Sequence, residues 1–513
     1  MLTNRSIDAA YRLRLGPALT LLAAVFVSAC ANGDASHEPA RRIRIAFGIG
    51  PSVRASSINV LTALLYSEPL IAHESNGRPM PSLAESWKWD DEGRRLTLRL
   101  KRNVKFHDGT PLTSQLVVEL LDRSRFAPAG KVPLGFERIT DVTAPDPQTV
   151  EIRLSRPDNF LLTELNELRV VHPANRDIGT GPFRLVRRQP IVEGQRFDGY
   201  HGGVPPTETV EIRTYETHRA AWAALMRDEA DAAQEVSRES VEFMNRSSGL
   251  RTYSSMQPFY VALVFNQAHP LLGTQAVRQA INHAIDRPAI VANALRGHGA
   301  VATGPIWPSH WAYEPRARGD DYDPAGAVAA LERAGLRRRT ASAGKPQVRF
   351  AIRCLFLDED PQYERIALML QKQLFDIGVQ LDLEPVNMTT LAERARSGQF
   401  DALLARANTG RTLMFAYWFW RSSGEEATAF WRTGYTGANA VLDQLRESRS
   451  DEETRAAIRA VDQRFREDAP AAFIAWTEVT RALHADVVVG DENVHDPFTA
   501  IWRWQKVPGT SSR

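Results

Sequence analysis

The stretch between residues 405 and 421 holds side chains suited to noncovalent binding of a small molecule. Arg406 and Arg411 stand on either side of the polar pair 408–409, and a guanidinium holds a carboxylate or phosphate through paired, charge-assisted hydrogen bonds. Four aromatic residues follow in a row at 417–420, and their faces can stack against a ligand. The alternative for the arginines is a surface ion pair, and for the aromatic run it is packing in a core.

Motifs for catalysis and metal binding are missing from the sequence. The chain has no G-x-S-x-G, H-E-x-x-H or C-x-x-C pattern and no P-loop. Its 12 histidines form no closely spaced pair within one helix, so we expect neither a metal site nor a cofactor. Gly48 to Val53 lacks the third glycine of a dinucleotide motif, and Gly179 to Phe183 reads as a tight crossover. These observations favour a binding protein over an enzyme.

The N-terminus predicts export from the cytoplasm. Residues 1–15 carry three arginines, and the apolar run from Gly16 to Ala29 is too short to span a bilayer comfortably. The run ends in Val27-Ser28-Ala29-Cys30, which resembles a bacterial lipobox. We therefore predict a lipoprotein signal peptide over 1–29, lipidation of Cys30 and a flexible tether over 30–41. An ordinary signal peptide with a chance cysteine is the alternative.

Length and charge limit the number of domains and the kinds of ligand that the protein can bind. The 513 residues suffice for about three domains. The formal net charge is +2, so no basic field points to nucleic acid. The second cysteine, Cys354, lies in an apolar run and reads as a small buried hydrophobe.

The expected elements are a mixture of strands and helices. Leu96, Leu98 and Leu100 alternate with polar residues and predict a half-buried strand. The segments 348–357, 366–376 and 381–385 predict a strand, a helix and a strand, in that order. This alternation is typical of a parallel sheet. Other expected elements are strands at 43–47, 149–154, 210–215 and 260–266, and helices at 59–70, 219–228 and 277–287.

The segment from Pro79 to Thr113 resembles the signature of the family 5 extracellular solute-binding proteins, which serve ABC importers. The similarity rests on PSLAESW at 81–87 and on VKFHDGTPLT at 104–113. Further similar segments are GTGPF at 179–183, VRQAINHAIDR at 277–287 and YDP at 322–324. The similar segments extend from residue 43 to about residue 405.

The resemblance implies an α/β, two-lobed periplasmic-binding-protein-like fold of the large peptide-binding class (type II), with an extra β-rich domain. Lobe 1 would consist of 42–68, 178–268 and 485–513. The extra domain would cover 69–177, and lobe 2 would cover 269–484. Such lobes close on a ligand in the cleft between them.

The function implied is that of a substrate-binding lipoprotein of an ABC importer, which delivers peptides or a related small solute to a permease. Expected partners are the ligand, the permease and ATPase subunits and, through the lipid anchor, the extracytoplasmic face of a bacterial membrane. We expect a monomer and no contact with nucleic acid. The alternatives are a receptor of the same fold for an opine, nickel chelate, heme or oligosaccharide, or an extracytoplasmic sensor without a permease.

The resemblance also places the ligand contacts after the strand that follows Gly398 to Asp401. Peptide receptors of this family commonly have an aspartate in this stretch that pairs with the peptide's ammonium group. This sequence has Asn408 and Thr409 there, with an arginine on either side, which favours an anionic ligand group. The predicted ligand-binding residues are Arg406, Asn408, Thr409, Arg411, Tyr417, Trp418 and Trp420.

Overall fold

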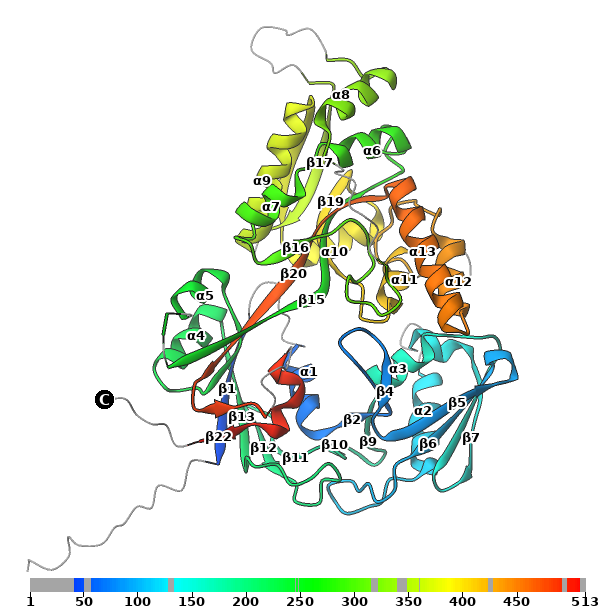
Figure 1. Ribbon diagram of the computed structural model, residues 1–513, viewed down its shortest axis with the longest axis vertical. Helices are drawn as coiled ribbons and strands as arrows, with labels where there is room; N and C mark the ends of the chain where they lie inside the picture. The colour runs from blue at the N-terminus through cyan, green and yellow to red at the C-terminus, as the bar shows by residue number, and fades with distance from the viewer. Residues whose placement is uncertain are drawn as a thin grey trace, which may run out of the picture. The chain divides into compact units, whose positions relative to one another are not determined.

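A computed structural model (Figure 1) describes residues 41–49, 57–127, 133–244, 246–247, 249–314, 322–338, 348–358, 360–422, 428–490 and 496–507. These residues belong to one compact unit that begins at Arg41. The predicted signal peptide and Cys30 lie outside the described residues, as does the tether apart from residue 41.

The backbone of the fold is a large mixed sheet. Its strands follow the order β11-β12-β13-β1-β14-β20-β15-β19-β17-β18, and β16 pairs with β20. The bounds are β1 Arg42–Gly48, β11 Phe183–Arg187, β12 Ile191–Arg196, β13 Thr209–Tyr215, β14 Ala232–Val236, β15 Leu250–Phe265, β16 Gly299–Val301, β17 Phe350–Leu357, β18 Val379–Val386, β19 Ala402–Asn408 and β20 Ala471–His484.

Two long strands, β15 and β20, connect two groups of strands. We call β1 and β11–β14 with their helices lobe 1, and β16–β19 with theirs lobe 2. β20 pairs with β14 of lobe 1, and β15 pairs with β19 of lobe 2. The register between β15 and β20 shifts between Met256 and Tyr260, and Figure 1 shows both strands crossing from one group to the other. The exact lobe boundaries stay a prediction, because these strands belong to both groups.

Lobe 1 packs short helices around the first strand. Its elements are α1 Ser57–Tyr66, α4 His218–Met226, α5 Arg238–Met244, η3 Pro497–Arg503 and the pair β21 Val487–Val488 and β22 Gln505–Lys506. Phe47, Leu65, Phe183 and Trp504 share its core. The helix predicted over 59–70 ends at Tyr66, because Pro69 has no N–H for a helical bond and Glu68–Pro69 forms strand β2.

Lobe 2 confirms the predicted strand–helix–strand unit, since β17 is parallel to both β18 and β19. The segment predicted as one helix over 277–287 is divided, because the Asp286 side chain accepts a hydrogen bond from Ala289 N (2.9 Å) and starts a new helix. The helices are α6 Gln275–His283, α7 Arg287–Asn293, α8 Pro324–Arg333, α9 Pro361–Asp376, α10 Met388–Ser397, α11 Met414–Trp420, α12 Asn439–Glu447 and α13 Asp451–Asp468.

The extra domain contains a separate antiparallel sheet of order β5-β6-β8-β7 with its own core. Leu96, Leu98 and Leu100 are buried on one face of β6, as their alternation predicted. Thr113 caps α2 by accepting a hydrogen bond from Leu116 N (3.5 Å). The elements are β2 Glu68–Pro69, β3 Ile71–His73, β4 Pro79–Pro81, β5 Ala84–Asp90, η1 Asp91–Gly93, β6 Arg95–Leu100, α2 Ser114–Arg125, η2 Leu134–Arg138, β7 Ile139–Asp146, β8 Thr149–Leu154, α3 Leu161–Glu167, β9 Arg169–His172 and β10 Asn175–Gly179.

His107 of the signature segment fastens the extra domain to the crossover into lobe 1. Its Nδ1 accepts a hydrogen bond from Gly179 N (3.3 Å), so its Nε2–H donates to Gly181 O (3.0 Å). A Cβ on Gly179 would lie 1.9 Å from the Tyr66 carbonyl oxygen. The crossover therefore needs glycine for close backbone approach, as its sequence predicted.

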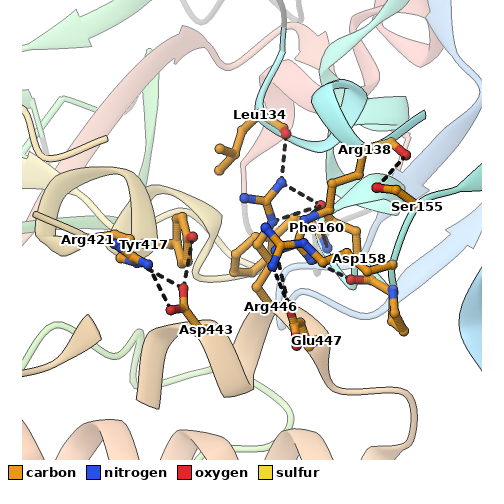
Figure 2. Close-up of polar contacts among 12 residues, drawn as sticks. Leu134, Arg138, Ser155, Asp158, Phe160, Tyr417, Arg421, Asp443, Arg446 and Glu447 are labelled. Atoms are coloured by element: carbon orange, nitrogen blue, oxygen red, sulfur yellow. Dashed lines mark hydrogen bonds and ion pairs between the residues drawn. The ribbon is translucent and has the colours of Figure 1, made fainter. Parts of the chain in front are cut away.

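A buried ionic junction joins the extra domain to lobe 2 (Figure 2). The Asp158 carboxylate lies 2.7 Å from Nη2 of Arg446, and both side chains are fully buried. Arg138 approaches the same carboxylate at 3.7 Å and pairs with Glu447 at 3.2 Å. The backbone N–H of Asn159 donates to Arg446 O (2.7 Å) across the junction. Although burial opposes it, the Asp158 charge holds the pKa of Arg446 above its usual range.

Candidate ligand-binding cleft

Two adjoining cavities lie where β15 and β20 pass between the lobes. The first, which we call the apolar cavity, has a volume of about 620 Å³, and the second, the polar cavity, about 1470 Å³. Both are lined by residues of lobe 1 and lobe 2, and the polar cavity also reaches the extra domain. They share the lining residues Leu64, Gln257, Phe259, Asn408, Asp496 and Thr499. The volume of the apolar cavity lies within the range of about 300–1,000 Å³ that is typical of small-molecule sites, and the volume of the polar cavity lies above it.

Arg406 lines the apolar cavity from β19 of lobe 2, opposite Val261 of β15. Its guanidinium carbon lies 4.2 Å from the centroid of the Phe259 ring. Its Nε is buried without a hydrogen-bond partner, as is Oε1 of Gln234 on β14 of lobe 1. Within the described part of the chain, Arg406 has no carboxylate partner within ion-pair distance. A buried polar group without a partner costs about 1–3 kcal/mol, so the two side chains are unsatisfied without a ligand.

Arg411 lines the polar cavity and likewise has no ion-pair partner within the described ranges. Burial lowers the pKa of Arg411, while the charge of Asp496 opposes that shift. Asp496 is shared by both cavities and pairs with Arg481 at 2.9 Å. Burial works against its charge, but Arg481 holds the pKa of Asp496 below its usual range. The cleft therefore contains a neutralised Arg481–Asp496 pair, whereas Arg406 and Arg411 have no such carboxylate partner among the described residues.

Asn408 and Thr409, between the two arginines, form hydrogen bonds mainly with the backbone around the end of β19. Thr409 is fully buried, and its Oγ1 donates to Pro305 O (2.5 Å) while its N–H donates to Pro258 O (2.9 Å). Asn408 lines both cavities, and its Oδ1 accepts from Gly410 N (2.8 Å). Thr409 thus anchors the end of β19, whereas Asn408 remains within reach of a ligand.

The aromatic run forms helix α11, which separates its members. Successive residues of a helix point about 100° apart, so four in a row cannot all line one cleft. Tyr417 is buried and donates to Asp443 Oδ1 (3.0 Å), and Trp420 is buried and donates to the Tyr260 hydroxyl (2.9 Å). Trp418 is exposed. Only Phe419 of this run lines the apolar cavity, and Tyr417, Trp418 and Trp420 line neither of the two cavities.

Several cavity residues were not among the sequence-based candidates. Gln234 and Glu235 come from β14, and Asp496 comes from the C-terminal segment. Phe430 and Trp431 follow α11 and pack with Phe419, with a ring-centroid distance of 4.8 Å between Phe419 and Trp431. No local motif marks these residues, because the fold alone brings them to the cleft. In the part of the chain that the structure describes, no group of three or more His, Cys, Asp or Glu residues is placed to hold a metal.

Two lobes, crossing strands and a cleft with unpaired polar groups define a solute-binding protein. The chain belongs to the bacterial extracellular solute-binding proteins, family 5, whose pattern matches residues 78–427. It is 27% identical over 365 residues to the probable D,D-dipeptide-binding periplasmic protein DdpA of Escherichia coli K12, covering 66% of this chain and 67% of that protein.

Solved structures of the same fold extend the comparison over most of the chain. NikZ from Campylobacter jejuni, solved with Ni(L-His), matches with a TM-score of 0.76 and 21% identity over 91% of this chain and 100% of NikZ. AgaA from A. tumefaciens R10, solved with agropinic acid, matches with a TM-score of 0.72 and 21% identity over 91% of this chain and 99% of AgaA. The predicted fold class is confirmed.

The family establishes the general role of the protein. It is an extracytoplasmic, non-catalytic solute-binding protein of an ABC importer. None of the helices in the described ranges is long and apolar enough to cross a membrane.

Proposed function

We propose that the protein captures a peptide or a related small solute with an anionic group, and delivers it to a membrane permease. The observation that carries this proposal is the pair of guanidinium groups, Arg406 and Arg411, that face the cleft without a carboxylate partner among the described residues. A ligand carboxylate would supply the missing partner through charge-assisted hydrogen bonds.

Lobe closure is the proposed capture step. Arg406 lies on lobe 2 and Gln234 on lobe 1, so a ligand that contacts both holds the lobes together. The register shift between Met256 and Tyr260 gives β15 and β20 a local irregularity at which they can bend. Ligand affinity then depends on how strongly the ligand favours the closed state over the open one.

The ligands named for similar proteins are a D,D-dipeptide, a nickel–histidine complex and agropinic acid. Each of these compounds contains at least one carboxylate, which fits the unpaired arginines. We favour the peptide class, because the first of these proteins shows the highest sequence identity of the three. An opine or a metal chelate remains the second candidate, and heme, an oligosaccharide or a sensor role without a permease are outcomes of the test.

The test is a thermal-shift screen of the mature protein against peptides, opines and nickel chelates. A ligand that binds only the folded state raises Tm by mass action. The Arg406→Met and Arg411→Met variants should weaken binding of the active compound at least about tenfold, because each removes a charged partner. The exposed Arg219→Met variant is the matched control and should bind normally. Unchanged affinity in both cleft variants would refute the site assignment.

Membrane anchoring through Cys30 is a separate part of the proposal. It is supported by the lipobox-like Val27-Ser28-Ala29-Cys30 after a basic and an apolar segment. A Cys30→Ala variant should no longer partition into the membrane fraction or acquire a radiolabelled lipid. Retention of lipid label by that variant would contradict the anchor.

A further inference from the structure

A second contact between the extra domain and lobe 2 lies apart from the buried ionic junction. It is made by the turn between β3 and β4, residues 74–78, which we call the strap. Hydrogen bonds within the strap fix its shape: the N–H of Glu74 donates to Arg78 O (2.9 Å), and the N–H of Gly77 donates to Glu74 O (3.0 Å). The side chain of Asn76 accepts a further bond from Arg78 N (2.8 Å). The strap is therefore a preformed element of the extra domain.

The backbone of the strap is bonded to lobe 2. The N–H of Trp311 donates to Asn76 O (3.0 Å), and Nε1 of Trp307 donates to Ser75 O (3.4 Å). Both tryptophans lie in the segment that follows β16. Two carbonyl groups of the extra domain thus have their donors in lobe 2, and both bonds break if the strap leaves lobe 2.

Arg78 anchors the end of the strap. Its guanidinium donates to both carboxylate oxygens of Asp451, at the start of α13 (3.1 and 2.7 Å). The guanidinium carbon also lies 3.5 Å from the centroid of the Trp311 ring. Both members of the ion pair are partly exposed, and a single exposed ion pair contributes little to stability. A bidentate pair combined with a cation–π contact, however, fixes the arginine in one geometry on lobe 2.

Gly77 brings the strap against the backbone of Arg411, which lines the polar cavity. A Cβ on Gly77 would lie 2.0 Å from Arg411 O, so this close approach requires glycine. Glu74 and Ser75 line the polar cavity together with Arg411. Gly77 and Arg78 line a third cavity of about 520 Å³, which has walls from the extra domain and lobe 2. The strap thus borders both cavities and supports the backbone that carries Arg411.

We propose that the strap holds the lobe 2 wall of the cleft in its ligand-binding geometry, and that Arg78 is a positioning residue that acts on Arg411 through the strap. Arg78 itself lines neither the polar nor the apolar cavity, so it acts without touching a solute there. Loss of this anchor lets the wall that carries Arg411 move away from a bound solute. This role of the extra domain goes beyond the proposed function and rests on it only in taking Arg411 as a ligand contact.

Hydrogen exchange at the Trp311 amide of the unliganded mature protein measures the strap directly, because this N–H donates to the strap. Arg78→Met loses the ion pair and the cation–π contact, so exchange should accelerate about 3- to 30-fold. Arg78→Lys keeps the charge and should recover part of the protection. Arg94→Met breaks an exposed pair with Asp91 inside the extra domain (3.1 Å) and is the control. Its exchange at Trp311 should stay within about twofold of wild type.

A matched pair of glycine variants tests the contact with Arg411. Gly77→Ala and Gly109→Ala both place a Cβ at positive φ, +86° and +91°, so the backbone strain is similar. Nothing lies within 4 Å of the Cβ position of Gly109, whereas the Cβ of Gly77 meets Arg411 O. Exchange at Trp311 should therefore be at least about fivefold faster in Gly77→Ala than in Gly109→Ala.

Binding kinetics test the positioning role. The probes are D-alanyl-D-alanine, the nickel–histidine complex and agropinic acid, after the ligands named for similar proteins. With a probe that binds, Arg78→Met should raise koff at least about threefold and leave kon within about twofold, because the strap holds the closed wall and does not contact the solute. Arg78→Lys should restore koff in part, whereas Arg94→Met should leave both rates unchanged.

The outcomes separate the strap from the proposed function. Exchange at Trp311 that stays within twofold of wild type in Arg78→Met would refute the strap. Equal exchange in the two glycine variants would refute the contact with Arg411. If exchange accelerates while koff is unchanged, the strap only ties the domains together and the positioning role is refuted. If none of these probes and no compound of the thermal-shift screen binds, the proposed function falls, and the strap is still decided by the exchange measurements.

Discussion

Replacement of Asp158 by Asn tests the buried junction between the extra domain and lobe 2. The substitution keeps the shape of the side chain but removes the carboxylate charge that lies 2.7 Å from Nη2 of the fully buried Arg446. Arg138, at 3.7 Å, loses the same partner. Removal of one member of a buried ion pair costs about 3–5 kcal/mol, because the remaining charge stays desolvated.

Hydrogen exchange at a single amide can measure this loss. The N–H of Asn159 donates to Arg446 O across the junction (2.7 Å), so it exchanges only when the junction opens. A loss of about 3–5 kcal/mol corresponds to about 150- to 5,000-fold faster exchange in Asp158→Asn. Mass spectrometry of the peptide that contains Asn159 follows this change directly.

Two further variants serve as controls for this prediction. The double variant Asp158→Asn with Arg446→Met should be less destabilised than Asp158→Asn alone, because it removes the uncompensated charge together with its partner. Glu119→Gln breaks an exposed helical ion pair with Arg123 (3.1 Å) and should change stability by less than about 0.5 kcal/mol. Exchange at Asn159 that accelerates less than about fivefold in Asp158→Asn would refute the view that this pair holds the junction.

Other predictions concern pH and backbone contacts. Burial raises the pKa of Glu164 to about 7. The contribution of the protonated side chain to the free energy of unfolding is therefore complete below the ordinary pKa of glutamate and is lost, by about 3 kcal/mol, as pH rises through 7. Urea unfolding at pH 5 and pH 8 should show this loss, and Glu164→Gln should abolish the difference. Burial lowers the pKa values of His73 and His310 to about 4, so Tm should fall as pH drops from 6.5 towards 4, and less so in His310→Gln. Gly179→Ala should lower stability by at least about 1–3 kcal/mol, because its Cβ would lie 1.9 Å from Tyr66 O; Gly249→Ala, whose nearest neighbour is at 3.9 Å, is the control and should leave the urea midpoint unchanged.

Elements with a strong local pattern could be predicted from the sequence. The alternation in β6 and the strand–helix–strand unit around α9 are local features, and both are confirmed. The end of α1 was placed too late because the apolar pattern continues beyond Tyr66, whereas Pro69 and pairing with β9 end the helix. The break before α7 depends on the side-chain cap of Asp286, which competes with helix continuation.

The candidate site was only partly predictable, because it is built from segments far apart in the chain. Arg406 and Arg411 lie in the stretch where the family resemblance places the ligand contacts, and both line the cleft. Glu235 and Asp496 have no local signal, since β14 is separated from β19 by two strands of the sheet and Asp496 precedes η3 near the C-terminus. Only the folded chain brings them to the cavity that Arg406 lines. The aromatic run left both cleft lining and core packing open, because its sequence does not say which face of α11 meets the core.

The junction closes a ring of contacts through the whole binding protein. Lobe 1 connects to lobe 2 through β15 and β20, lobe 2 connects to the extra domain through Arg446 and Asp158, and the extra domain returns to lobe 1 through His107 and Gly181. Figure 1 shows these three parts in turn. Because the three parts are connected in a closed circuit, the two lobes cannot move apart unless more than one of these contacts deforms. In the proposed closure mechanism, lobe opening would have to deform the junction as well as bend the crossing strands, and a substitution at Asp158 is then expected to change how long a solute stays bound.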